Sequence, residues 1–305
     1  MKRVIIYIIT FCLFINISPS AKASTKLEDT NTYNTNMKQD ILCLMMGYPE
    51  YVAGVQRDNS GYVYIIMKSG KKILYDDKKE KSFQQKLASP DLQDTLEQIY
   101  PLVFTKKLMD KNFDPGRFRN YALLSEVYGQ SRQQIEQNLK NVRVGYSNCL
   151  FNKNNGAAQA LQNVMKELTS LSASRPDIRR NVFPCSGTYN YRLISGTNQL
   201  SPHGYAIAID LARDNRDYWQ WATPQQGEER LVSYPKEIVD IFEKNNFVWG
   251  GKWNHFDILH YEYRPEIILK ARYFSHKSTG EWYDGVGSNE DAVKGYISKI
   301  NEALK

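Results

Sequence analysis

Two segments far apart in the sequence carry the residue types that constrain this chain most. The first runs from Ser201 through His203 to Asp210, and the second holds Asp257 and His260. Two imidazoles and one carboxylate can bind Zn²⁺ and leave a fourth coordination position open, and a further carboxylate nearby suits a general base. A fold that uses this chemistry must bring the two segments together, so the motifs constrain topology as well as function.

The residues before Asp210 predict a short strand with two unlike faces. In the run 206–211, a period of two places Ala206, Ala208 and Asp210 on one face and the bulky aliphatic residues on the other. The bulky face suits a core. The other face has small side chains and ends in a carboxylate, so it leaves room for a cleft with a metal ligand at its bottom.

The second segment predicts an interruption of regular structure. Asp257 and His260 are three positions apart, so they would point to opposite faces of a regular strand. They converge on one ion only across a helical turn or an irregular bend. We therefore expect a break in the backbone at 257–260.

Together these motifs resemble those of a known family. Residues 140–270 are similar to the D-alanyl-D-alanine carboxypeptidase (VanY-like) zinc metallopeptidases and to the related L-alanyl-D-glutamate endopeptidases. The resemblance is carried by the pattern Ser201-x-His203-x-x-Ala206-x-Ala208-x-Asp210, followed by Asp257-x-x-His260. Neither half of the pattern is specific alone, but the combination is.

The resemblance implies a role for each site residue. It implies that His203, Asp210 and His260 bind Zn²⁺ and that Asp257 is the catalytic base. It also implies that Arg192, upstream of the first motif, helps to polarise the scissile carbonyl. Considered alone, His203 with Asp210 would fit a structural hydrogen-bonded pair equally well, and Arg192 could be a surface residue in a salt bridge.

A third segment, residues 249–253, is similar to the family's Gly-Gly-x-Trp segment and departs from it at one position. Lys252 stands where an acidic residue is often found, which predicts a cation at the cleft rim. Ala206 is a second departure, since the family usually has Gly there, and we expect its methyl group to narrow the cleft floor. Lys252 and Arg213 are candidate partners for a substrate's terminal carboxylate, which favours a carboxypeptidase.

Several neighbouring residues have two interpretations from the sequence alone. His255 suits a position on the rim or behind the ligands better than direct metal binding. Glu262 could orient His260 or be a plain surface acid. Trp249 and Trp253 fit either an ordinary core or the lining of a substrate cleft.

The N-terminus predicts export. Lys2 and Arg3 precede an apolar stretch, and small residues around residue 23 suit a signal peptidase, so 1–23 is predicted to be a cleaved signal peptide. The apolar stretch is too short for a confident membrane span, and no stable span is expected after cleavage; an uncleaved N-terminal anchor is the alternative. We therefore expect a secreted or cell-envelope protein.

The net charge of the chain argues against nucleic acid as a partner but excludes few other functions. The chain has 40 basic and 33 acidic side chains, and the mature protein would keep a net charge of +4 once Lys2, Arg3 and Lys22 are removed. This small, dispersed surplus suits a location near anionic wall polymers and argues against nucleic acid as a partner.

Three cysteines remain after the predicted cleavage site. Cys149 and Cys185 both fall in the predicted peptidase part and are the candidate pair, whereas Cys43 would stay unpaired. The two could equally be reduced core residues.

The rest of the sequence predicts an α+β fold, with a small mixed or antiparallel sheet, flanking helices and the zinc site in a cleft on the sheet. Residues 24–40 are predicted to be a flexible spacer because they contain few apolar side chains. Residues 41–115 form a small N-terminal region that could bind the wall, cover the cleft or only pack on the enzyme. Residues 116–305 form the zinc peptidase domain.

Local patterns place the individual elements. We expect a β-hairpin around Ser69-Gly70, a helix over 83–98, a helix capped by Ser131, and a strand at 141–144. Further expected elements are a helix over 157–171, strands at 188–193 and 206–211, and a helix opened by Pro235.

The sequence therefore predicts an exported zinc D,D-carboxypeptidase that acts on peptidoglycan stem peptides. Three alternatives stay open. The first is a peptidoglycan endopeptidase that cuts L-Ala-D-Glu bonds or cross-links with the same zinc chemistry. The second is a non-catalytic cell-wall-binding module that kept the fold. The third is a hydrolase that uses Cys185 as its nucleophile and needs no zinc.

Overall fold

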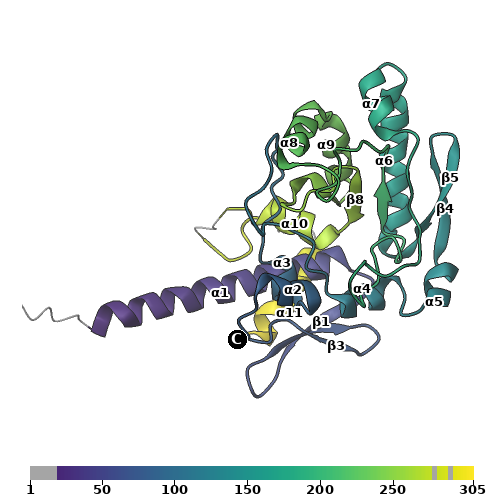
Figure 1. The fold of residues 1–305 in the computed structure, drawn as a ribbon. Coiled ribbons are helices and arrows are strands. Elements are labelled where there is room, and N and C mark those ends of the chain that lie inside the picture. The colour runs from purple at the N-terminus through teal and green to yellow at the C-terminus, as the bar shows by residue number, and fades with distance from the viewer. Residues whose placement is uncertain (1–18, 277–279, 288–290) are drawn as a thin grey trace, which may run out of the picture. The chain divides into compact units, whose positions relative to one another are not determined.

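A computed structural model describes residues 19–276, 280–287 and 291–305 (Figure 1). The chain divides into two compact units, Met1–Met37 and Lys38–Lys305. Most of the predicted signal peptide, residues 1–18, lies outside the described residues. The α+β class is confirmed, because helices flank small antiparallel sheets.

The first described element is helix α1, Pro19–Gly47. The predicted spacer, residues 24–40, lies within this helix rather than in irregular chain. A physical reason is that Ile41, Leu42 and Leu44 anchor the end of the helix in a buried core, and propagation from an anchored turn adds one backbone hydrogen bond per residue. Along the described part of the chain, no helix is both long and apolar enough to cross a membrane.

The N-terminal region contains a three-stranded antiparallel sheet. Its strands, in the order β1-β2-β3, are β1 (Val52–Arg57), β2 (Val63–Met67) and β3 (Lys72–Leu74). The turn between β2 and β3 contains Gly70 at a φ of 89°, a left-handed conformation that favours glycine. The predicted hairpin is therefore confirmed. The C-terminal helix α11 (Asp291–Ala303) packs against β1.

The helix predicted over 83–98 is interrupted. The structure has α2 (Phe83–Ala88) and α3 (Leu92–Leu96) instead. Pro90 lies between them and has no backbone N–H to continue a helical ladder. The Asp91 side chain then caps α3 by accepting a hydrogen bond from the Asp94 N–H at 2.8 Å.

The middle of the chain forms a helical layer on a β-hairpin. Its elements, in chain order, are α4 (Tyr121–Tyr128), α5 (Arg132–Gln137), β4 (Leu139–Val144), β5 (Ser147–Asn152), the 3₁₀ turn η1 (Asn154–Gly156), α6 (Ala157–Ser172) and α7 (Pro176–Val182). Helix α6 packs on β4 and β5, as Figure 1 shows. The predicted apolar stripe of α6, which includes Leu161, Val164 and Leu168, is buried.

A second three-stranded antiparallel sheet contains residues of both motif segments. Its strands are β6 (Ala208–Asp210), β7 (Phe247–Trp249) and β8 (His260–Tyr263), in the order β6-β8-β7. The neighbouring helices are α8 (Pro224–Ser233), α9 (Lys236–Lys244) and α10 (Pro265–Tyr273), with the 3₁₀ turn η2 (Gly250–Lys252) after β7. Pro235 precedes α9, as predicted.

The strand predicted at 188–193 is wrong. Within this segment only Leu193 forms an isolated bridge, with Leu200, and Gly187, just before the segment, forms another with Asp210. Its residues 190–193 are exposed, so no apolar face holds the segment against a sheet. The predicted strand at 206–211 is shorter than expected, since it begins at Ala208.

Lys252 is not at the cleft rim, contrary to the sequence-based expectation. The residue is completely buried, and its Nζ lies 2.5 Å from Glu243 Oε1 and 2.6 Å from the Pro101 carbonyl oxygen. Tyr100 also donates a hydrogen bond to Glu243 Oε1, at 2.5 Å. The cation is therefore a structural link between η2, α9 and the N-terminal region, and it cannot bind a substrate.

Replacing Lys252 by Met tests this role. The change leaves the buried Glu243 carboxylate without its cation, so we expect a loss of about 3 kcal/mol in the free energy of unfolding. The control is Lys244→Met, because Lys244 makes an exposed ion pair with Glu167 at 3.1 Å and should cost less than about 1 kcal/mol. Urea denaturation measures both, and equal effects would contradict the buried role of Lys252.

Candidate metal centre

The central sheet places two of the predicted ligands opposite each other. Asp210, at the end of β6, pairs with His260, at the start of β8, across the antiparallel ladder. Ala208 and Glu262 are the next pair on the same face. Ile209 lies on the other face and is fully buried, so the alternation predicted from the sequence is confirmed for β6.

The third predicted ligand, His203, comes from a tight turn before β6. The Ala206 N–H donates to the His203 carbonyl at 3.1 Å, and Ala206 has a φ of 56°. A glycine adopts this left-handed conformation without strain, which gives a physical reason for the family's usual glycine. Ala206 is fully buried and does not line the cleft, so the expectation that its methyl group narrows the floor is wrong.

The three ligand atoms form a nearly equilateral triangle. His203 Nε2 is 3.2 Å from Asp210 Oδ1 and 3.2 Å from His260 Nδ1, and His260 Nδ1 is 2.9 Å from Asp210 Oδ1. Tetrahedral Zn²⁺ with bonds of 2.0–2.1 Å separates its ligand atoms by roughly 3.3 Å. The donor set and its spacing therefore fit a divalent metal ion, with one face of the triangle left for a further ligand.

The far nitrogen of each imidazole faces an oxygen atom, which is a carbonyl oxygen for His203 and a carboxylate oxygen for His260. His203 Nδ1 lies 2.6 Å from the Thr188 carbonyl oxygen, and since a carbonyl only accepts, Nδ1 carries the proton and Nε2 is free to bind a metal. His260 Nε2 faces Glu262 Oε2 at 3.8 Å. Such partners orient metal-binding histidines and fix their tautomers.

Glu262 is itself locked by two arginines. Arg119 donates to both carboxylate oxygens, from Nη2 to Oε2 at 2.7 Å and from Nε to Oε1 at 3.0 Å, and Arg264 Nη1 lies 3.2 Å from Oε1. Glu262 has no exposed surface, and although burial raises its pKa, the attraction of Arg119 and the hydrogen bond to His260 hold that pKa well below its usual range. Glu262 is therefore an ionised partner for His260 rather than a surface acid.

The electrostatics of the triangle favour positive charge. Burial alone lowers the pKa of His260, but the hydrogen bond to Asp210 and the negative charges of the nearby Glu262 and Asp257 carboxylates raise it to about 10. Burial likewise raises the pKa of Asp210, yet the attraction of His203 and His260 leaves it well below the usual range. The pocket thus stabilises either an imidazolium or a bound cation.

Asp257 lies beside the triangle and is positioned by the Gly-Gly segment. Its N–H donates to the Gly250 carbonyl at 2.9 Å, and the turn closes with the His260 N–H donating to the Asp257 carbonyl at 3.1 Å. The break predicted at 257–260 is confirmed. A Cβ atom at Gly250 would lie 2.4 Å from the Asp257 carbonyl oxygen, and one at Gly251 would lie 2.3 Å from the Trp249 ring. Both glycines are therefore required by close packing.

The surroundings of Asp257 suit proton transfer near neutral pH. Burial raises the pKa of its carboxyl group to about 7, with the negative charge of Asp210 adding to the rise and the positive charge of His260 opposing it. A carboxylate whose pKa lies near the working pH can both accept and return a proton.

All five predicted site residues line one cleft of about 940 Å³. Three are the candidate ligands, and the others are Asp257 and Arg192. Arg192 is exposed, and within the described ranges its guanidinium has no ion pair, so its charge is available to a ligand.

The N-terminal region supplies part of the cleft wall. Gln84, Leu87 and Ala88 of α2 line it, and Gln199 Nε2 donates to the Leu87 and Ala88 carbonyl oxygens at 3.0 and 2.5 Å. Of the roles left open for residues 41–115, two have direct contacts: the region packs on the rest of the chain, as the contact of Lys252 with Pro101 shows, and it contributes to the cleft wall. Residues 38–305 form one compact unit, so the boundary at residue 115 stays a prediction.

The residues that had two interpretations from the sequence alone differ in whether they line the cleft. Trp249 is fully buried in the core, whereas Trp253 and His255 line the cleft. His255 Nδ1 lies 2.6 Å from Asp114 Oδ2, which places His255 on the rim and away from the ligands.

Arg117, another cleft residue, also contacts Asp114, at 2.9 Å. Sequence patterns missed both Arg117 and Arg119, because neither belongs to a recognisable motif.

Comparison with known proteins agrees with this geometry. Residues 195–263 match the family model described as D-alanyl-D-alanine carboxypeptidase. The family resemblance is confirmed. The segment matched to the D-alanyl-D-alanine carboxypeptidase family contains the three candidate ligands and Asp257, and Arg192 precedes it. The match supports a metallopeptidase acting on peptidoglycan. No curated protein and no solved structure matches the chain.

A second group of acidic residues has a different character. Asp76, Asp77 and Asp91 lie close enough together to share an ion. Lys81 Nζ already lies among them, 2.8 Å from Asp91 and 3.2 Å from Asp77. An ammonium group therefore provides the positive charge there, and the group is a structural ion-pair cluster.

Two cysteine residues lie outside the cleft, and one of them contacts the backbone of a candidate ligand. Cys185 Sγ donates to the Asp210 carbonyl oxygen at 3.1 Å. Cys149 and Cys185 are free thiols, and the interaction with Cys185 lowers the pKa of Cys149 to about 7. Neither thiol lines the cleft, and the pKa of Cys185 is raised, which argues against Cys185 as a nucleophile.

Metal titration of the purified protein tests the centre. We expect one tightly bound divalent ion per chain, measured by elemental analysis and calorimetry with Zn²⁺, and loss of that ion in His203→Ala. Asp77→Asn is the matched control, because Lys81 satisfies that acidic group and the stoichiometry should not change. Protein that binds no transition metal, or that loses it equally in Asp77→Asn, would contradict the assignment.

Proposed function

We propose that the protein is an exported zinc D,D-carboxypeptidase that hydrolyses the terminal D-Ala-D-Ala bond of peptidoglycan stem peptides. The observation that carries the proposal is the convergence of His203 Nε2, Asp210 Oδ1 and His260 Nδ1 on one point of the cleft that Asp257 also lines. The family match supports the peptidase class and the wall substrate. The signal-like N-terminus supports export, and N-terminal sequencing of the envelope protein, expected to begin after residue 23, checks it.

Each group of the cleft has a defined task in this proposal. Zn²⁺, when bound by the three ligands, polarises the scissile carbonyl and acidifies the attacking water. Asp257 takes the proton from that water and returns it to the leaving amine, as its raised pKa allows. Arg192 donates hydrogen bonds to the carbonyl oxygen as negative charge develops there. Thr188 and Glu262 keep the two imidazoles in the required orientation.

Recognition of the substrate's terminal carboxylate requires a cation other than those proposed from the sequence. Lys252 is buried, and Arg213 stacks on the Trp221 ring at 4.1 Å and does not line the cleft. Arg117 does line it, and its hydrogen bond to Asp114 uses only Nη1, which leaves other N–H groups for a ligand. We therefore assign the carboxylate to Arg117 and the carbonyl to Arg192.

The proposed catalytic roles are separable from metal binding. Asp257→Asn keeps the shape of the side chain but removes the base, so we expect zinc to stay bound and turnover to fall by about 10²- to 10⁴-fold. Arg192→Ala should also keep zinc and slow turnover by about 10²-fold. Zinc content and steady-state rates on a pentapeptide stem measure both. Near wild-type turnover in Asp257→Asn would demote this residue to a structural acid.

The choice of bond is tested with paired substrates. We expect mass spectrometry of digested muropeptides to show loss of a single alanine from pentapeptide stems. A stem with a C-terminal carboxamide should be cut much more slowly, and Arg117→Ala should reduce this discrimination because it removes the proposed carboxylate partner. Cleavage between L-alanine and D-glutamate, or within cross-links, would assign the enzyme to the endopeptidases instead.

A further inference from the structure

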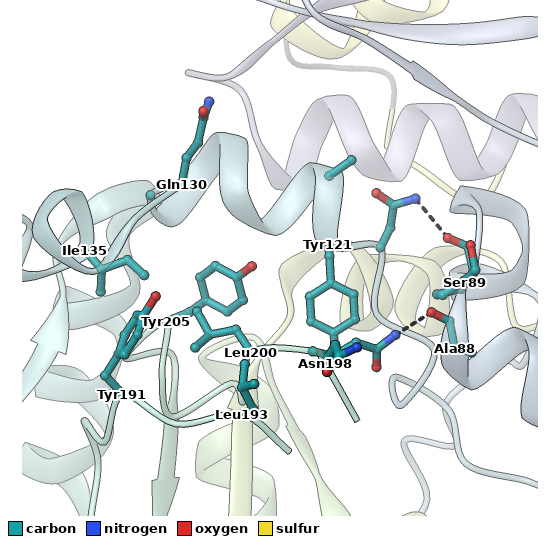
Figure 2. A pocket seen from close by; sticks show the side chains of 15 residues that line it. Ala88, Ser89, Tyr121, Gln130, Ile135, Tyr191, Leu193, Asn198, Leu200 and Tyr205 are labelled. Carbon is teal, nitrogen blue, oxygen red and sulfur yellow. Dashed lines mark hydrogen bonds between the residues drawn. The ribbon is translucent and has the colours of Figure 1, made fainter. Parts of the chain in front are cut away.

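A second cavity, of about 530 Å³, lies beside the metal cleft (Figure 2). We call it the tyrosine pocket, and its lining includes Tyr121, Tyr191, Tyr205, Leu193, Leu200 and Asn198. Its volume is in the range typical of small-molecule sites, which is about 300–1,000 Å³. Neither the proposed catalytic steps nor the recognition of the stem's terminus uses these residues.

An extended segment, residues 191–194, separates the two cavities. Tyr191 and Leu193 line the tyrosine pocket, whereas Arg192 and Ile194 line the metal cleft. This alternation is the expected behaviour of extended backbone, in which successive side chains point to opposite sides. The segment is held by hydrogen bonds to its returning partner: the Ser201 N–H donates to the Arg192 carbonyl at 3.0 Å and the Ile194 N–H to the Gln199 carbonyl at 2.8 Å.

The two cavities also share a border. Ala88, Asn198 and Gln199 line both of them, and Ala88 and Asn198 are exposed. A ligand bound in the metal cleft can therefore continue over this border into the tyrosine pocket without passing through the protein.

The chemistry of the tyrosine pocket differs from that of the cleft. The described residues that line it include no charged side chain, whereas the cleft contains three arginines and two aspartates. A neutral pocket does not favour a stem peptide, because such peptides carry carboxylates such as that of D-glutamate, and a buried charge needs a partner. It favours a neutral ligand that has both apolar surfaces and polar edges.

The tyrosine side chains are held in place to present such a surface. Figure 2 shows the rings of Tyr121, Tyr191 and Tyr205 around Leu200. The Tyr205 hydroxyl lies 3.0 Å from Ser125 Oγ, and Arg132 lies over the Tyr191 ring, 5.5 Å from its centroid. Tyr191 nevertheless keeps 39 % of its surface exposed. Rigid rings with polar tips, beside an amide that can donate and accept, suit a sugar ring.

We propose that the tyrosine pocket binds an N-acetylated sugar of the glycan strand that carries the stem peptide. This inference rests on the proposed function, because it identifies the part of the same substrate that lies beyond the peptide. The pocket would make the enzyme prefer stems that are still attached to their glycan.

Paired substrates test the proposal. The ratio of kcat/KM for a disaccharide pentapeptide to that for the same free pentapeptide measures the contribution of the sugars. We expect a ratio of about ten or more for the wild type, and a fall of about tenfold in Tyr191→Ala, which removes one stacking face. Tyr191→Phe keeps the ring and should keep most of the preference.

Tyr146→Ala is the matched control. Tyr146 is 90 % exposed and does not line the tyrosine pocket, so its removal should leave the ratio unchanged. Each variant is judged by the ratio of two kcat/KM values. A general loss of folded protein lowers both values by the same factor, so the ratio does not change.

The outcomes separate this inference from the proposed function. Cleavage of both substrates with a ratio near one would overturn the sugar site and leave the carboxypeptidase intact. A preference conferred by a second, cross-linked peptide instead of the sugars would also overturn it. If neither substrate is cut, the proposed function fails, and calorimetry with N-acetylglucosamine oligomers decides the pocket. Binding that Tyr191→Ala abolishes supports the site, and no binding at millimolar concentration refutes it.

Discussion

The arrangement of this site depends on one buried carboxylate. Glu262 has no exposed surface, and an ionised carboxyl group in such a position is strongly unfavourable unless cations and hydrogen bonds compensate it. Arg119 and Arg264 provide that compensation, and the carboxylate then holds His260. Arg119 comes from the segment that follows the N-terminal region, so the ion pair joins β8, the strand that carries His260, to the chain that precedes both motifs. Fold and metal chemistry are thus linked through the same atoms.

The N-terminal region belongs to the same system of buried links. Lys252 joins Glu243 and the Pro101 carbonyl, and Lys270 Nζ lies 2.5 Å from Asp40 and 2.6 Å from the Leu96 carbonyl. Each of these lysines comes from an element that packs around the central sheet and contacts residues before 115. A region without any catalytic motif therefore supplies part of one wall of the metal cleft.

Sequence patterns predicted those features that depend on neighbours along the chain. The apolar stripe of α6, the hairpin around Gly70 and the break before His260 all follow from spacing within a few residues. The ligand set followed from the family pattern. Patterns failed where the outcome depends on partners far away in the sequence. Lys252 was expected at the cleft rim because of its position in the Gly-Gly-x-Trp segment, but it is buried, and its burial depends on Glu243 and Tyr100. The contact of Arg119 with Glu262 joins residues 143 positions apart, and no local signal could have revealed it.

The extended segment between the cavities has a consequence for how this protein can vary. Surface loops usually tolerate insertions and deletions, since their length is seldom tied to a core. Here, the side chains of Tyr191 and Arg192 line different cavities on opposite sides of one extended segment. Adding or removing a single residue upstream would turn the arginine toward the tyrosine pocket and the tyrosine toward the metal cleft. Selection on this exposed segment should therefore act on its length more strictly than on most of its side chains, and natural variants are expected to accumulate substitutions there rather than gaps.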